Sequence, residues 1–226
     1  MDFRRFGTVL QDLDADFTAE RPFIITDLLQ RCATSTVTED EIWDLPVGRR
    51  IADLLALSSR GGAREFDVIV PCPHCGQKSE VTLELEELLA LAASAVTGSG
   101  FRLPTGRDQR AWLRCAAEHG NIPVDRMMGS LRTSEGLALE DIESLLDQAD
   151  PLVRGAVTAV CPNCGRSTEV EADLAGKALA RLEAEQNRLL ESVHLLASRY
   201  HWSEAEILAL PVWRRERYLE LLRSES

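Results

Sequence analysis

Two Cys-x-x-Cys segments that are near copies of each other constrain this chain more than any other feature. They read Cys-Pro-His-Cys-Gly at 72–76 and Cys-Pro-Asn-Cys-Gly at 161–165, and a Glu-Val pair follows each segment at the same distance. A Cys-x-x-Cys turn ending in glycine directs both sulfurs to one ion, and two such knuckles complete the four-thiolate shell of a structural zinc site. The sequence therefore predicts a duplicated zinc-ribbon unit whose metal ligands are Cys72, Cys75, Cys161 and Cys164.

The same spacing allows other chemistry. A pair of disulfides and a redox-active Cys-x-x-Cys are the alternatives, and paired knuckles are a more specific signal for zinc than a single one. A closed shell of four cysteines leaves no open position for water or substrate, so a zinc ion held this way has a structural role. We expect the two knuckles to meet within one chain, and exchange between two chains is the alternative arrangement.

Composition favours a helical, acidic protein. The chain has 226 residues, of which 45% are hydrophobic and only 5% aromatic, so its core must consist mostly of Leu, Ala and Val. The formal net charge of −12 argues against non-specific binding to nucleic acid, which depends on neutralising phosphates. No stretch approaches the apolar length of a membrane span, and no signal-peptide region follows Met1. We expect a soluble, cytoplasmic protein with no membrane partner.

Residue periodicity predicts a mainly α fold with small β hairpins and a long C-terminal helix. Strands are expected on both sides of each knuckle, and the long helix is expected at about 173–200. Gly98-Ser99-Gly100 predicts a hinge. Cys32 and Cys115 lie in apolar helical patterns and are expected to be small core residues.

The predicted hinge and the predicted long helix divide the chain into three expected segments. Residues 1–97 form a helical segment with the first knuckle. Residues 98–175 form a helical insertion and the second knuckle, which completes the ribbon. Residues 176–226 form the long helix and a helix–Pro–helix docking tail.

A second repeat concerns that docking tail. The segment at 41–50 matches the segment at 206–215, and a weaker third copy lies at 103–108. In each, proline follows an apolar residue at a helix start, where its missing N–H costs nothing. One interpretation is a recurring helix–Pro–helix corner. The other is a docking corner whose Arg pair is exposed to an acidic partner and whose aromatic residues anchor a neighbour. The candidate docking residues are Arg49, Arg50, Trp202, Trp213, Arg214 and Arg215.

Sequence signatures of catalysis are missing. The chain has neither a Gly-rich phosphate loop nor Gly-x-Ser-x-Gly. Glu191 and His194 form a Glu-x-x-His pair, but di-metal carboxylate sites need two such pairs and further glutamates. We therefore expect a protein that is not an enzyme and has no small-molecule substrate.

Three segments, taken in order, resemble a known family. The run at 44–50 followed by the first knuckle, the run at 101–108 and the run at 193–211 are similar to T4-type phage baseplate hub and hub-assembly proteins. They are also similar to zinc-knuckle baseplate components of extracellular contractile injection systems. The resemblance covers most of residues 40–222. It implies a non-enzymatic part in building the baseplate of a phage-tail-like contractile particle, with other baseplate or tail subunits as partners. Either an assembly factor or a permanent component fits these motifs.

A zinc-ribbon adaptor or regulator that binds nucleic acid or another protein is the alternative function. A nucleic-acid adaptor would need a basic face, which the strongly acidic composition disfavours. Absence of salt-dependent DNA binding would remove this alternative.

Overall fold

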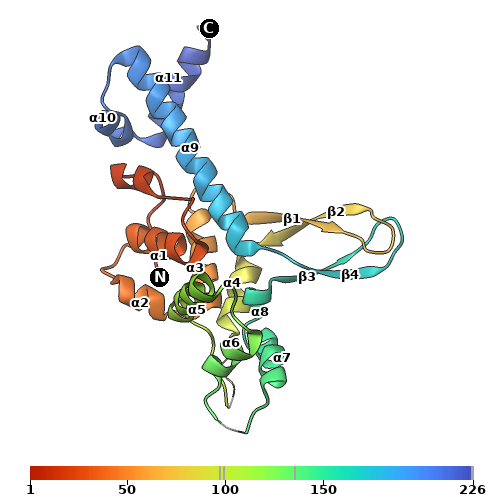
Figure 1. The fold of residues 1–226 in the computed structure, drawn as a ribbon. Helices are drawn as coiled ribbons and strands as arrows, with labels where there is room; N and C mark the ends of the chain where they lie inside the picture. The colour runs from red at the N-terminus through yellow and green to blue at the C-terminus, as the bar shows by residue number, and fades with distance from the viewer. Residues whose placement is uncertain (97, 99, 135, 225–226) are drawn as a thin grey trace.

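The computed structural model describes residues 1–226 except 97, 99, 135, 225 and 226. Two β hairpins project side by side from a helical body, and one long helix leaves the body in a different direction and carries two further helices at its far end (Figure 1). The predicted mainly α fold with small β hairpins is confirmed. Ser99, at the centre of the predicted hinge, lies outside the described residues.

The N-terminal part of the body is built from short helices with clear start and stop signals. The elements are η1 (Leu10–Asp14), α1 (Arg21–Cys32), α2 (Glu39–Asp44) and α3 (Val47–Ser58). Helix α2 begins with a capping box, in which the Thr38 N–H donates to Glu41 Oε2 at 2.8 Å and the Glu41 N–H donates to Thr38 Oγ1 at 3.3 Å. Helix α3 packs against α1, α4, α8 and α9, so it is the centre of the body.

The two hairpins are separate two-stranded antiparallel sheets. They consist of β1 (Glu65–Pro71) with β2 (Lys78–Glu84), and of β3 (Ala156–Val160) with β4 (Ser167–Glu171). Val68 pairs with Val81 in the first hairpin, and Val157 pairs with Val170 in the second. Each knuckle is the turn of its hairpin, as predicted, and a helix follows each second strand directly or within two residues.

The remaining helices divide between the body and the C-terminal arm. They are α4 (Leu85–Ala93), α5 (Gly106–His119), α6 (Val124–Leu131), α7 (Leu139–Ala149), α8 (Pro151–Arg154), α9 (Leu174–Tyr200), α10 (Glu204–Ala209) and α11 (Val212–Ser224). The bounds of α9 agree with the predicted long helix. Asp173 caps it by accepting a hydrogen bond from the Gly176 N–H at 2.9 Å.

Apolar side chains form three clusters among the described residues. The largest includes Leu28 of α1, Leu54 of α3, Phe66 of β1, Leu152 of α8 and Leu182 of α9, so it draws on all three segments defined from the sequence. A second cluster surrounds Phe101 and Ile142, and a third surrounds Leu196, Ile207 and Leu219 at the far end of α9.

The two cysteines outside the knuckles have different environments. Cys32 is fully buried in the largest cluster, as predicted, and burial raises the pKa of its thiol to about 12. Cys115 is only half-buried on α5, where Arg126 Nη1 donates to its sulfur at 3.3 Å. The expectation that Cys115 is a core residue is therefore wrong, because the helix that carries it lies on the surface of the body.

Candidate metal centre

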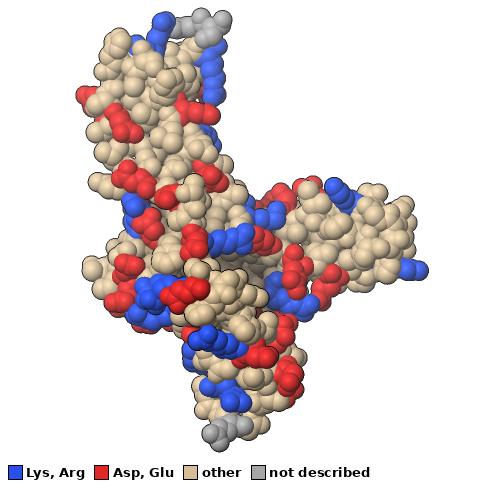
Figure 2. Space-filling view, in the orientation of Figure 1, with Lys and Arg blue, Asp and Glu red and all other residues tan. Residues whose placement is uncertain are grey.

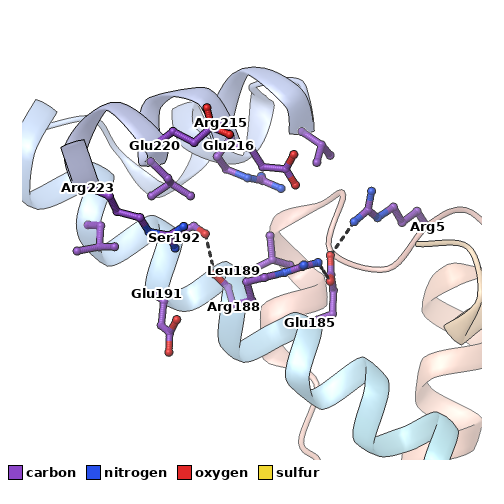
Figure 3. Close-up of a pocket in the computed structure, with 13 residues that line it drawn as sticks. Arg5, Glu185, Arg188, Leu189, Glu191, Ser192, Arg215, Glu216, Glu220 and Arg223 are labelled. Atoms are coloured by element: carbon purple, nitrogen blue, oxygen red, sulfur yellow. Dashed lines mark hydrogen bonds and ion pairs between the residues drawn. The ribbon is translucent and has the colours of Figure 1, made fainter. Parts of the chain in front are cut away.

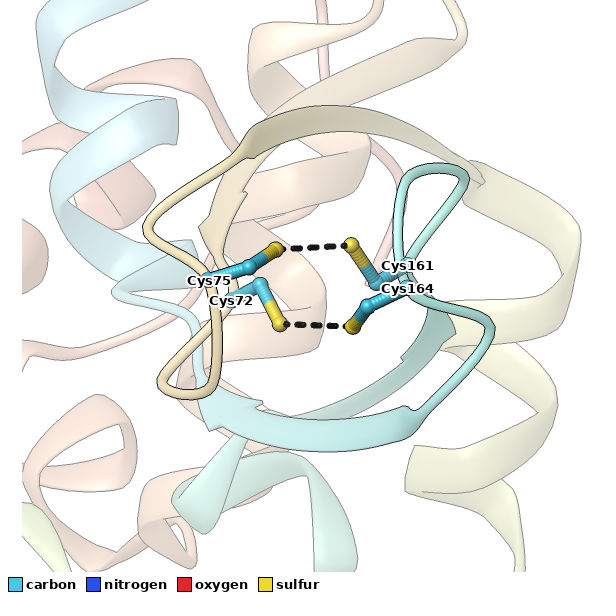
Figure 4. Close-up of side chains that lie close together, drawn as sticks. All are labelled: Cys72, Cys75, Cys161 and Cys164. Carbon is cyan, nitrogen blue, oxygen red and sulfur yellow. Dashed lines mark hydrogen bonds between the residues drawn. The ribbon is translucent and has the colours of Figure 1, made fainter.

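The four knuckle sulfurs converge on one point between the tips of the hairpins (Figure 4). All four lie within 4.8 Å of one another, and the shortest separations are 3.6 Å, from Cys72 to Cys164 and from Cys75 to Cys161. A tetrahedron with metal–sulfur distances of about 2.3 Å has sulfur–sulfur edges of about 3.8 Å. The cluster therefore has the dimensions needed to hold one metal ion.

Hydrogen bonds in the two knuckles repeat each other. The Gly76 N–H donates to the Cys72 carbonyl at 2.9 Å, and the Gly165 N–H donates to the Cys161 carbonyl at 2.9 Å. Both glycines have positive φ angles, 73° and 70°, and a Cβ on either would meet nothing within 4 Å. Glycine is therefore needed here for its backbone conformation and not for space.

Pairing between the knuckles is symmetric. The first cysteine of each knuckle lies nearest to the second cysteine of the other, and Cys72 and Cys161 are buried while Cys75 and Cys164 are exposed. Arg166 Nη1 lies 3.0 Å from His74 Nδ1, which adds a polar contact across the two turns. His74 thus contacts the opposite knuckle and does not belong to the four-sulfur cluster.

The sulfurs are too far apart for disulfide bonds, whose length is about 2.05 Å. Hydrogen bonding by the His74 backbone N–H lowers the pKa of Cys72 to about 6. The Arg166 backbone N–H acts in the same direction on Cys164, but local desolvation and hydrogen bonds with the neighbouring sulfurs outweigh it and raise the pKa of that thiol to about 12. A bound cation would favour loss of the thiol protons and would offset the repulsion between four thiolates this close together.

Inner faces of the two hairpins pack together beneath the cluster. Val68 and Val70 of β1 and Val157 of β3 are buried, whereas the residues that alternate with them within each strand are exposed. This alternation fixes which side of each hairpin faces the other, and it brings the two knuckles to the same end. The four ligands predicted from the sequence are thus brought together by two segments far apart in the chain.

The two arginines of each predicted docking pair differ in their exposure to solvent. Arg49 and Arg214 are exposed, whereas Arg50 is only 1% exposed and Arg215 only 6% exposed. The expectation that both residues of each Arg pair face solvent is therefore wrong for Arg50 and Arg215. The reason is the turn of the helix, because the residue after the first arginine faces back toward the preceding helix.

Arg50 has a structural environment. Its Nη2 donates to the Pro22 carbonyl at 2.6 Å and to Thr26 Oγ1 at 2.7 Å, both on α1, and its guanidinium lies 4.8 Å from the centre of the Trp43 ring. Burial lowers the pKa of Arg50 to about 10. Hydrogen bonds and an aromatic face thus stabilise this cation inside the body.

The two predicted aromatic anchors also separate. Trp202 stacks on Tyr200 with ring centres 4.8 Å apart and contacts Tyr218 edge-on at 5.1 Å, so it belongs to the internal packing of the C-terminal arm. The expectation that Trp202 is an anchor for a neighbour is not supported by this position. Trp213, in contrast, is 69% exposed.

A charged pocket of about 290 Å³ lies between α9 and α11 (Figure 3). Glu185 accepts hydrogen bonds from Arg5 at 2.9 Å and from Arg188, and Arg215 lies in the wall between the helices. Glu191 lines this pocket, while His194 is not among its described lining residues. The Glu-x-x-His pair therefore does not converge on this pocket.

Charges of both signs mix over the surface. On the face shown in Figure 2, Lys and Arg alternate with Asp and Glu, and no continuous basic surface crosses the body or the hairpins. No helix among the described residues is both long enough and apolar enough to cross a membrane. Protein-family models, curated proteins and solved structures give no match to this chain.

Proposed function

We propose that the chain is a non-enzymatic structural or assembly component of the baseplate of a phage-tail-like contractile particle. It is made and assembled in the cytoplasm, and its partners are other baseplate or tail subunits. The support for the baseplate assignment is the ordered sequence resemblance at 44–50, 101–108 and 193–211. The support for a scaffold role is the closed cluster of four sulfurs, which joins two distant segments of the chain.

Zinc is the ion that we propose for this cluster. A tetrahedral set of four thiolates is typical of zinc and of iron–sulfur centres. Zinc has no redox chemistry of its own, and with four cysteines it has no open position for a substrate. Its contribution is stability, because the ion is bound by the folded hairpins and not by the unfolded chain.

The particle itself provides the test. Cells that make the particle without this chain should yield tails with missing or incomplete baseplates in electron micrographs. Wild-type chain and Cys115→Ser, whose cysteine lies outside the cluster, should restore assembly, and Cys72→Ser should not. Complete, functional particles in the absence of the chain would refute the proposal.

Two further measurements sharpen the assignment. An immunoblot of purified particles distinguishes a permanent component from an assembly factor. Titration of the purified chain with duplex DNA at several salt concentrations should show no binding, because the acidic surface repels phosphates. Strong salt-dependent binding would favour the adaptor function instead.

A further inference from the structure

The two copies of the helix–Pro–helix corner have the same backbone geometry. Leu45, before the first proline, has φ −65° and ψ 140°, and Leu210, before the second, has φ −68° and ψ 138°. The Arg50 N–H donates to the Pro46 carbonyl at 3.0 Å, and the Arg215 N–H donates to the Pro211 carbonyl at 3.1 Å. The corners at 38–50 and 203–215 are therefore equivalent structures, which we call the first and the second corner.

The first corner is covered by an extended segment of this chain, residues 103–106. The Val47 N–H donates to the Pro104 carbonyl at 2.8 Å, the Gly106 N–H donates to the Leu45 carbonyl at 3.2 Å, and Pro46 and Thr105 form a β-bridge. The corner thus offers one donor and one acceptor, and an extended strand uses both.

A helix continues from that segment and contacts α2. Arg107, in the first turn of α5, forms ion pairs with Asp40 at 2.8 Å and with Asp44. Arg110, one turn later, lies 4.8 Å from the centre of the Trp43 ring. The first corner therefore recognises a strand that runs into a helix with Arg at its start.

No extended segment among the described residues hydrogen-bonds to the second corner in this way, although α10 contacts η1 and Leu208 is buried. Pro211 and Trp213 are exposed, whereas their counterparts Pro46 and Gly48 are half-buried and buried. Among the described residues, no hydrogen bond involves the Val212 N–H or the Leu210 carbonyl, which match the groups used in the first corner. This donor and this acceptor are therefore not used by any described residue.

Differences in sequence between the two corners indicate which kind of segment would fit the second corner. Ala205 and Ala209 stand at the positions of Asp40 and Asp44, so an Arg like Arg107 would find no carboxylate. Leu208 replaces Trp43, and the exposed Trp213 replaces Gly48. These changes make the second corner more apolar, and an exposed Trp beside free backbone groups is typical of a binding hot spot.

We propose that the second corner binds a partner protein through an extended Leu-Pro-x-Gly-type segment that continues into a helix. The residue at the position of Arg107 in that partner is apolar and packs on Ala205 and Ala209. A second copy of this chain is not the occupant, because its own segment carries Arg107 and is already docked on its own first corner. This inference goes beyond the proposed function, since it holds whatever particle the chain belongs to.

Two synthetic peptides of residues 101–120 serve as probes, one with the native sequence and one with Arg107→Leu. They are titrated into the full-length, isotope-labelled chain, and the amide signals of Leu210, Val212 and Trp213 are followed by NMR. Intramolecular docking corresponds to effective concentrations in the millimolar range, so millimolar peptide is the appropriate concentration. The Arg107→Leu peptide should shift these signals and bind several-fold more tightly than the native peptide, because its Leu buries apolar surface on Ala205 and Ala209 while the Arg of the native peptide finds no carboxylate there.

Variants of the second corner make the test specific. In Ala205→Asp/Ala209→Asp, the preference should reverse in favour of the native peptide. Val212→Pro removes the N–H donor at a position where helices accept proline, and it should abolish binding, while Val212→Ala should keep it. The proposal is overturned if neither peptide shifts these amides, or if Val212→Pro binds as well as Val212→Ala. None of these outcomes depends on particle assembly, so this test and that of the proposed function can fail separately.

Discussion

The hairpin pair and the helical body are held together by different physical means. The body contains side chains that are fully withdrawn from water, among them Leu28, Leu54 and Leu55, and its stability comes from apolar burial. Each hairpin has only two strands, and an isolated two-stranded hairpin is marginally stable in water. The inner faces of the hairpins join the apolar cluster of the body, and a metal ion at the four sulfurs would fix their far ends.

The duplicated knuckles together form a site that neither copy has alone. One knuckle provides two sulfurs, and two knuckles facing each other provide a closed shell. The two helix–Pro–helix corners do not combine in this way, because each stays beside its own preceding helix. One is covered by residues 103–106, and the other is exposed.

The largest effect is expected at the metal ligands. Cys72→Ser, Cys161→Ser or treatment with a chelator should destroy the order of the hairpins, since metal binding contributes about 10–16 kcal/mol in small zinc modules. Hydrogen exchange of the amides in β1–β4 should become fast, while α1 and α3 remain protected. Cys115→Ser is the control and should exchange like wild type. Unchanged protection of the hairpins in Cys72→Ser would contradict the metal-centre account.

A smaller effect is expected at the second corner, far from the metal. Arg215→Glu places a carboxylate where a buried guanidinium lies near Glu185, and it should lower the free energy of unfolding by about 2–4 kcal/mol. Arg214→Glu, one residue away and exposed, should change it by less than about 0.5 kcal/mol. Denaturant titration measures both. Equal effects of the two substitutions would show that the burial of Arg215 is not maintained in solution.

Cys32→Ser tests the body without touching the hairpins. Its hydroxyl would be buried among apolar side chains, at a cost of about 1–3 kcal/mol of unfolding free energy. Metal content should stay at the wild-type value, because Cys32 lies in the body. A loss of metal in this variant would mean that the body and the hairpins do not form independently.

The smallest effect concerns a buried carboxyl group in the body. Burial raises the pKa of Asp150 from its ordinary value of 3.8, although its Oδ2 accepts a hydrogen bond from the Gly48 N–H at 3.1 Å. A raised pKa means that this group favours the folded state below pH 3.8 and that the contribution is lost as pH rises through the folded-state pKa. Asp150→Asn should therefore gain stability relative to wild type as pH increases. Parallel unfolding curves of the two proteins from acid to neutral pH would contradict this assignment.

Local patterns explain the parts of this structure that the sequence predicts correctly. Knuckle spacing, alternation of apolar residues in the strands and the helical period over 174–200 are all visible within short windows. The capping boxes at Thr38 and Ser203 have the same local origin, because a hydroxyl residue precedes a glutamate by three positions in both.

Long-range contacts explain what the sequence did not predict. The burial of Arg50 depends on the Pro22 carbonyl of α1 and on the ring of Trp43, and no pattern around Arg50 specifies those partners. Pairing of Leu45 and Pro46 with residues 104–106 joins segments far apart in the chain. The repeat in the sequence did contain a signal for this contact, since its Leu-Pro copies at 45–46 and 103–104 both belong to the pairing. Helix α6 has a weak local signal, because Gly129 and the short length of the segment weaken its helical pattern.

The most direct test of the central claim is native mass spectrometry of the purified chain, combined with elemental analysis, before and after addition of a chelator. We expect one zinc ion per monomer, and its removal should occur together with the loss of hairpin order. A folded chain without any bound metal would contradict the four-cysteine centre. Zinc found only in an obligate dimer would contradict pairing of the two knuckles within one chain.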